Sequence, residues 1–230
     1  MGQIASFAAE IEVPREGWIS GLNARLPKDI VVHDAQPCYR RYNPRFHAAH
    51  KRYRYVVRCG RQRDPMMRKQ VWQLGPKGAR RDVESRSDRV EDYLDIEAMG
   101  VAAKHFLGTH DFRAFRQSGD KREVVVREMF EVEVLPGWNG RADLLAIEVV
   151  GDSFMKNMVR IMAGTLVEVG RGRFASDDIP EMLREDSDRA NAGQTAPPQG
   201  LTLIAIELAR FDGPGDAFDR VTAGEPPCRR

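Results

Sequence analysis

The run FMKNMVRIMAGTLVEVG, residues 154–170, carries the clearest helix signal in the chain. Its apolar side chains recur at the 3.6-residue spacing of an α-helix, and Gly170 follows them as a stop. The apolar stripe consists of Phe154, Met158, Ile161, Met162, Thr165, Leu166 and Val169. We therefore expect one long helix here, with this stripe against the core.

Arg160 lies inside this run but off the apolar stripe. At about 100° per residue, Asn157, Arg160 and Gly164 share a second face of the helix. An arginine flanked by an amide and a small residue can reach an anion or a carboxylate. An ordinary arginine on the solvent face is the alternative, and the residues alone leave both readings open.

Elsewhere in the chain, strand patterns dominate. Strands are expected over residues 5–13, 30–33, 53–58, 124–135, 144–150 and 201–208. The last of these is apolar on both faces, which favours an interior strand. Helices are expected after Pro14, after a capping Asp95 and near Ser176. Hairpin strands with helices outside them predict an α+β protein with a largely antiparallel sheet.

Residues 78–92 mix charges without an apolar period, which predicts an exposed linker or insertion. This segment separates a first half, 1–77, from a second half, 93–210. Residues 211–230 form a tail that we expect to be loosely held.

Composition narrows the class of protein. The 230 residues are 42% hydrophobic and 30% charged, which is typical of a globular chain. No apolar run approaches the roughly 20 residues of a membrane helix, and the start lacks a secretory signal. The three cysteines form no CxxC pair, which favours a reducing compartment and a cytoplasmic protein. We expect no membrane and no metal: His47 and His50 have no carboxylate or cysteine at ligand spacing.

Positive charge is concentrated in one segment. Between Arg40 and Lys69 there are 11 basic residues and one acid, Asp64, which leaves the rest of the chain at a net −8. Tyrosines lie among these cations, as expected of a nucleic-acid-binding surface. Tyr53 can stack on a base while Lys51 and Arg52 hold phosphates. A solvated Arg-rich strand with Tyr53 packed on the sheet is the alternative.

Five blocks follow one another along the chain: LNARLPKDI (22–30), YNPRFHAAHKRYRY (42–55), GTHDFRAFR (108–116), FMKNMVRIMAGTL (154–166) and AGQTAPPQGL (192–201). In this order they resemble the tRNA pseudouridine synthase A family, and the resemblance covers about residues 2–206. The resemblance implies two halves, each similar to an RNA-recognition motif, in one long and mostly antiparallel sheet with helices on one side and a basic cleft. It also implies a homodimer that lays tRNA across both subunits.

For the chemistry, the resemblance implies isomerisation of uridine to pseudouridine in the anticodon stem-loop of tRNA, with no cofactor and no metal. A flipped base, a nucleophilic aspartate near ribose C1′ and loss of a proton from C5 are required. The family's base-stacking tyrosine falls on Tyr53, and the arginine that pairs with the aspartate falls on Arg160. The other expected substrate contacts are Arg45, Lys51, Arg52, Arg116 and Asn157.

The family's nucleophilic aspartate lies in a GRTDAGVHAxGQ motif, of which Met1-Gly2-Gln3 resembles only the last three positions. We therefore expect the chain as given to be truncated in its first half and inactive. Either Met1 is an internal residue of a longer protein or the gene is truncated. Asp111 is a tempting substitute, but the family has this aspartate in addition to its nucleophile. A non-catalytic RNA-binding protein that uses the segment 40–69 is the alternative function, and a dimeric scaffold without RNA ranks last.

Overall fold

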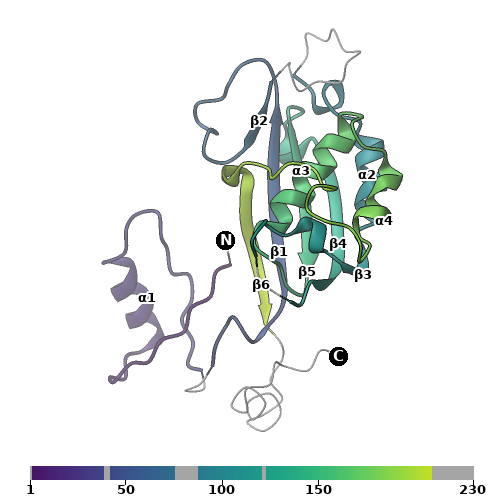
Figure 1. Ribbon diagram of the computed structural model, residues 1–230. Coiled ribbons are helices and arrows are strands. Elements are labelled where there is room, and N and C mark those ends of the chain that lie inside the picture. Colours follow the sequence, from purple (N-terminus) through teal and green to yellow (C-terminus); the bar gives the residue numbers. More distant parts are fainter. Residues whose placement is uncertain (1, 39–41, 76–87, 121–122, 209–230) are drawn as a thin grey trace. The chain divides into compact units, whose positions relative to one another are not determined.

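The computed structural model describes residues 2–38, 42–75, 88–120 and 123–208 (Figure 1). The chain divides into two compact units. The larger unit contains residues 1–3 and 49–207, and the smaller contains 4–48 and 208–230. Most of the expected linker and all of the expected tail lie outside the described residues. The domain boundaries therefore stay a prediction.

A six-stranded sheet forms the centre of the larger unit, with the order β2-β1-β5-β4-β3 and with β6 also paired to β1. The strands are β1 (Ala48–Cys59), β2 (Trp72–Leu74), β3 (Gly108–Asp111), β4 (Val126–Pro136), β5 (Leu144–Gly151) and β6 (Leu201–Leu208). The β1–β5, β5–β4 and β4–β3 pairs are antiparallel, and β1–β2 is parallel. The predicted α+β class with a mostly antiparallel sheet is confirmed.

Three helices of the larger unit contribute buried residues to the main core (Figure 1). They are α2 (Ile96–Lys104), α3 (Met158–Gly170) and α4 (Ile179–Met182). Tyr55 and Ile147 lie opposite each other in the β1–β5 register and belong to the same buried cluster as most of α3. Because successive strand residues point to opposite faces, this register also fixes which β1 residues face the helices.

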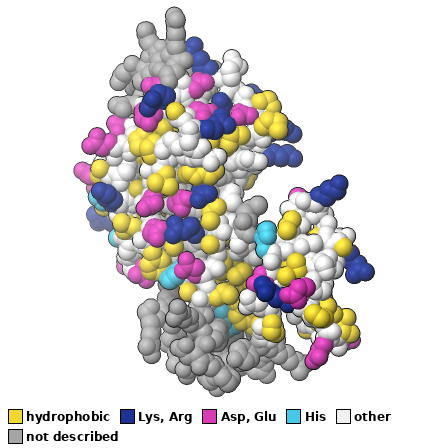
Figure 2. Space-filling model, turned by 180° about the vertical axis from the view of Figure 1, so that it is seen from behind, with side chains coloured by type: hydrophobic (Ala, Val, Ile, Leu, Met, Phe, Trp, Pro, Cys, Tyr) yellow, Lys and Arg dark blue, Asp and Glu magenta, His cyan; other side chains and the backbone are white. Residues whose placement is uncertain are grey.

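The other face of the sheet is more polar. Arg52 and Arg54, which alternate with the core tyrosines, form ion pairs with Glu148 on β5. A small apolar cluster of Val56, Val71 and Leu144 lies on this face as well. Figure 2 shows basic and acidic side chains next to one another across the middle of the face it draws.

The predicted central helix is confirmed at its end but is wrong at its start. It was expected to include Phe154, yet α3 begins at Met158 because Asn157 adopts a left-handed conformation with φ 62°. Asparagine tolerates this region better than most residues, whereas a helix cannot continue through it. The turn at Asn157 therefore sets where α3 begins.

Shorter elements connect these strands and helices. They are η2 (Val90–Asp92), η3 (Arg113–Phe115), η4 (Trp138–Gly140), η5 (Ser176–Asp178) and η6 (Pro198–Gly200). The predicted cap of α2 is confirmed, because Asp95 accepts a hydrogen bond from the Ala98 amide at 3.0 Å. The helix expected near Ser176 is a 3-10 turn, η5, that leads into α4.

The smaller unit contains α1 (Arg15–Asn23), which confirms the helix expected after Pro14. The strands expected over 5–13 and 30–33 are wrong, since neither segment is extended into a sheet in the structure. A strand needs a partner for its backbone groups. Phe7 contacts Trp18 edge-on at 5.2 Å between ring centroids, but its side chain stays 61% exposed.

The position expected for residues 201–208 also needs correction. Among the described strands, β6 pairs with β1 and lies outside the main strand path. Its apolar residues are only half-buried. The Gly2 amide donates a backbone hydrogen bond of 3.0 Å to the Ile204 carbonyl. The described residues therefore bury β6 less than an interior strand would be buried.

Backbone contact joins α3 to the segment 192–197. A side chain on Gly164 would overlap the carbonyl oxygen of Gln194, and one on Gly193 would lie 2.7 Å from Thr165 Cα. Thr165 Oγ1 accepts a hydrogen bond from the Gly193 amide at 2.9 Å. Glycines at both positions thus allow a helix and a loop to meet without intervening side chains.

We predict that Gly164→Ala destabilises the fold by about 1–3 kcal/mol or more, because the added methyl forces the loop away from α3. Gly100→Ala on α2 is the matched control. A Cβ there meets no atom within 4 Å, so this change should stabilise by about 0.5–1 kcal/mol. Urea unfolding of both variants measures the difference, and equal effects would contradict the close contact.

Candidate active site

Arg160 lies on the first turn of α3, half-buried, with its guanidinium held from two sides. Its Nε donates to the Ala196 carbonyl at 2.7 Å, and its Nη1 donates to Asn157 Oδ1 at 2.8 Å. The Ala196 amide in turn donates to the Arg160 carbonyl at 3.1 Å. A long, flexible side chain is thereby fixed in one direction.

Asn157 connects this arginine to a third element. Its Nδ2 donates to Gln117 Oε1 at 2.9 Å, and the Gln117 amide donates to the Lys156 carbonyl at 3.1 Å. Gln117 follows η3 and the predicted site residue Arg116. The left-handed turn at Asn157 therefore gathers the end of η3, the start of α3 and Arg160 in one place.

The buried carboxylate of Glu168 helps to hold the loop 192–197 in place. Glu168 is only 5% exposed and accepts hydrogen bonds from Arg171, Arg173 and Gln194 at 2.7–2.8 Å. A buried charge is tolerated only when such partners satisfy it. Through Gln194, Glu168 holds the segment that carries the Ala196 carbonyl.

Tyr53 lies on β1 with its ring edge-on to Phe154, at 5.1 Å between centroids. Burial raises the pKa of the Tyr53 phenol, so the ring is uncharged at neutral pH. Tyr55, two residues on and on the same face, donates its hydroxyl to the Pro197 carbonyl at 2.7 Å. Burial raises the pKa of Tyr55 as well, and the nearby charge of Arg160 opposes that rise. Tyr53 and Arg160 are thus on the same side of the sheet, linked through Tyr55.

The remaining predicted site residues lie in different places. Lys51 is on the Tyr53 face by strand alternation, whereas Arg52 points to the other face and pairs with Glu131 at 2.7 Å. Arg45 belongs to the smaller unit, so the structure does not relate it to Tyr53. Of the predicted site residues, the structure joins Asn157 to Arg160 directly and places Arg116 next to Gln117, the partner of Asn157. Tyr53 and Lys51 share the face of β1 that Tyr55 connects to the loop holding Arg160.

Asp111 has a structural partner. It is 7% exposed and accepts hydrogen bonds from the backbone and side chain of Arg113 at 2.6–3.1 Å. Burial opposes ionisation, but these bonds hold the pKa of Asp111 below its usual value. Both carboxylate oxygens of Asp111 therefore already accept hydrogen bonds from Arg113.

Arg160 retains donors after its two hydrogen bonds, since a guanidinium has five N–H groups in a rigid fork. Among the described residues, no acidic side chain forms an ion pair with it. A carboxylate is the partner that this fork fits best, with two parallel hydrogen bonds. The described residues also contain no cluster that could hold a metal ion and no helix long and apolar enough to span a membrane.

Comparison with known proteins gives consistent matches. A family model described as "tRNA pseudouridine synthase" matches residues 102–208, which include Arg116, Asn157 and Arg160. A protein of Geotalea uraniireducens named "tRNA pseudouridine synthase A" is 41% identical over 206 residues, covering 90% of this chain and 76% of its own. The chain belongs to the tRNA pseudouridine synthase A family.

Other relatives with the same name support this assignment. The protein of Geobacter sulfurreducens is 38% identical, with 90% of this chain and 76% of its own covered. That of Myxococcus xanthus is 39% identical, with 93% and 72% covered. The predicted family membership is confirmed.

Sequence reasoning missed the groups that hold Arg160. Gln117, the Ala196 carbonyl and Glu168 were not among the expected site residues. Ala196 lies in the quoted AGQTAPPQGL block, but a backbone carbonyl leaves no signature in the sequence. Gly164 and Gly193 were the available signal, because both blocks place a glycine where two backbones meet.

We predict that Asp111→Asn destabilises the fold at pH 7 by about 1–3 kcal/mol, because Arg113 loses a charged acceptor. The lowered pKa means that the ionised form stabilises the fold above about pH 4 and that this contribution is lost as the pH falls. The gap between wild type and variant should therefore shrink in urea unfolding at pH 3.

Asp186→Asn is the control for this variant, because Asp186 pairs with Arg184 at the same spacing but at 75% exposure. An exposed pair contributes close to nothing. Equal stability of Asp111→Asn and wild type at pH 7 would refute a structural role for Asp111.

Proposed function

We propose that this protein is a tRNA pseudouridine synthase that isomerises uridine to pseudouridine in the anticodon stem-loop. The observation that carries the proposal is the fixed guanidinium of Arg160, with donors left for a carboxylate, on the same side of the sheet as the half-buried ring of Tyr53. Family membership supplies the substrate class, tRNA, and the reaction type.

The reaction is an isomerisation, so no atoms are gained or lost overall. The N1–C1′ glycosidic bond breaks with the help of an aspartate, the base turns, and a C5–C1′ bond forms. C5 then loses a proton and N1 gains one. Arg160 keeps the aspartate ionised and oriented through charge and hydrogen bonds. Tyr53 gives the flipped uracil an uncharged aromatic face to stack on.

The aspartate is proposed to come from a GRTDAGVHA segment. The 230 residues contain no match to this segment, and Asp111 is committed to Arg113. We therefore propose that a chain of these residues alone is inactive. The family resemblance further supports a cytoplasmic homodimer that lays tRNA across both subunits, with Arg45, Lys51, Arg52 and Arg116 as further substrate contacts. Arg52 would need to exchange its carboxylate partners for phosphate.

A second candidate is a non-catalytic RNA-binding protein. It is favoured by exposed basic residues that do not depend on the aspartate, such as Arg63 and Lys69. Product analysis separates the two functions, since only a synthase leaves pseudouridine in the tRNA.

We predict that the 230-residue chain forms no pseudouridine on tRNA, whereas a chain completed with the family's N-terminal residues, including the GRTDAGVHA segment, does. Because the isomerisation leaves the mass of the nucleoside unchanged, pseudouridine is detected by nucleoside chromatography of digested tRNA. A version with Asn in place of the segment's Asp is the control and should be inactive. Turnover by the 230-residue chain would show that the nucleophile lies within these residues.

In the active, extended chain, Arg160→Ala should lower turnover much more than tRNA affinity, because Arg160 acts on the aspartate and not on the tRNA as a whole. Arg184→Ala, which removes an exposed arginine paired only locally, should change neither. An equal loss of turnover and affinity in Arg160→Ala would contradict the assigned role.

A further inference from the structure

The seven cations from Arg52 to Lys69 form two groups in the structure. Arg52, Arg54 and Arg58 on β1 are each paired with acids from other parts of the sheet. Arg52 pairs with Glu131, Arg54 with Glu148 and Arg58 with Asp143, at 2.6–2.7 Å. These three arginines are therefore largely neutralised within the fold.

The second group lies on the loop between β1 and β2, residues 60–70, which we call the basic loop. It carries four exposed cations, Arg61, Arg63, Arg68 and Lys69, and a single acid. That acid, Asp64, accepts a hydrogen bond from the Met66 amide at 3.0 Å and lies 3.5 Å from Arg141. The surface of the loop therefore keeps a net positive charge.

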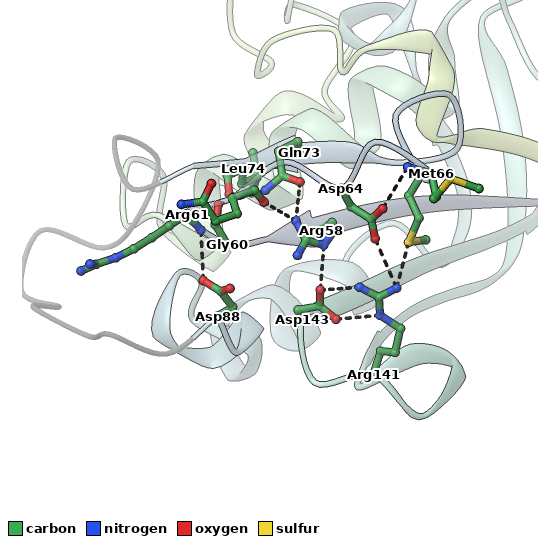
Figure 3. A network of polar contacts seen from close by, with 12 residues as sticks. Arg58, Gly60, Arg61, Asp64, Met66, Gln73, Leu74, Asp88, Arg141 and Asp143 are labelled. Carbon is green, nitrogen blue, oxygen red and sulfur yellow. Dashed lines mark hydrogen bonds and ion pairs between the residues drawn. The ribbon is translucent and has the colours of Figure 1, made fainter.

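A polar network fixes the base of this loop (Figure 3). Arg58 Nη1 donates to the Gln62 carbonyl at 2.6 Å and to Gln73 Oε1 at 2.8 Å. Gln73 Nε2 donates to the Gly60 carbonyl at 3.0 Å. Asp143 joins Arg58 to Arg141, whose Nη1 lies 3.2 Å from Met67 Sδ. Figure 3 shows the Arg61 guanidinium pointing away from this network.

A fixed loop loses less conformational entropy on binding than a flexible one. The buried Arg58 fixes the base of the loop, and the exposed side chains of Arg63, Arg68 and Lys69 are available to a ligand. Within the loop itself, which the structure describes in full, the only carboxylate is Asp64, and it is already bonded to the Met66 amide and close to Arg141. Arginine and lysine side chains in such a setting match a phosphate backbone. The loop lies at the upper left in Figure 1 and therefore at the upper right in Figure 2, which is seen from behind. Dark blue side chains gather at that edge in Figure 2.

We propose that the basic loop binds the phosphate backbone of tRNA at nucleotides remote from the one that reacts. Tyr53 and Cys59 are six residues apart on β1, which corresponds to about 20 Å at the rise of a strand. The loop begins one residue later, so its phosphates belong to a different part of the tRNA from the flipped uridine. This inference rests on the proposed function for the identity of the RNA.

The test compares two variants of the full-length protein that each remove one arginine and one lysine. Arg63→Gln/Lys69→Gln changes the basic loop, and Lys104→Gln/Arg184→Gln changes exposed cations elsewhere in the larger unit. tRNA affinity is measured between 50 and 200 mM salt, about the range over which phosphate contacts dominate. Both variants have the same net charge, so an effect of overall charge alone affects them equally.

The loop variant should reduce the slope of log K against log salt by about 1.4–1.8 units and weaken binding roughly 25- to 60-fold at 0.1 M salt. The control should keep the wild-type slope. A wild-type slope in the loop variant, or the same change in both variants, would overturn the proposal. If the extended protein, which includes the GRTDAGVHA segment, binds tRNA but forms no pseudouridine, the result counts against the proposed function and leaves the loop result valid.

Discussion

The rest of the site depends on the contact between α3 and the segment 192–197. Gly164 and Gly193 remove the side chains that would keep the two backbones apart, and Thr165 and Glu168 then bind the loop. Only at this separation can the Ala196 carbonyl accept a hydrogen bond from Arg160. The orientation of the Arg160 guanidinium thus depends on the lack of a side chain at Gly164 and at Gly193.

Much of the larger unit follows from local sequence pattern. The stripe from Met158 to Val169 predicts α3, and the hairpin of β4 and β5 follows from two apolar runs around a glycine-rich turn. Asn157 shows the limit, because periodicity extends the helix to Phe154 while one left-handed residue ends it. Residues 5–13 show another limit, since an alternating pattern needs a partner strand before it forms sheet.

Charge is also poorly predicted from a segment alone. The cations of β1 dominate their own stretch of sequence, but antiparallel pairing places Glu148 opposite Arg54 and brings Asp143 to Arg58. The sequence does not show the strand register. Counting the cations of the segment 40–69 alone therefore overstates its net positive charge in the folded protein. The arginines of β1 are largely neutralised in this way, whereas the basic loop keeps four exposed cations.

The central claim is that Arg160 and Tyr53 serve a nucleophilic aspartate from outside these 230 residues. The most direct measurement is the intact mass of the protein in the pseudouridine-forming fraction from its own cells. Because the proposed nucleophile has no match within these 230 residues, we expect a mass above 26.0 kDa. A mass of 26.0 kDa in an active fraction would contradict this expectation, since the nucleophile would then lie within these 230 residues.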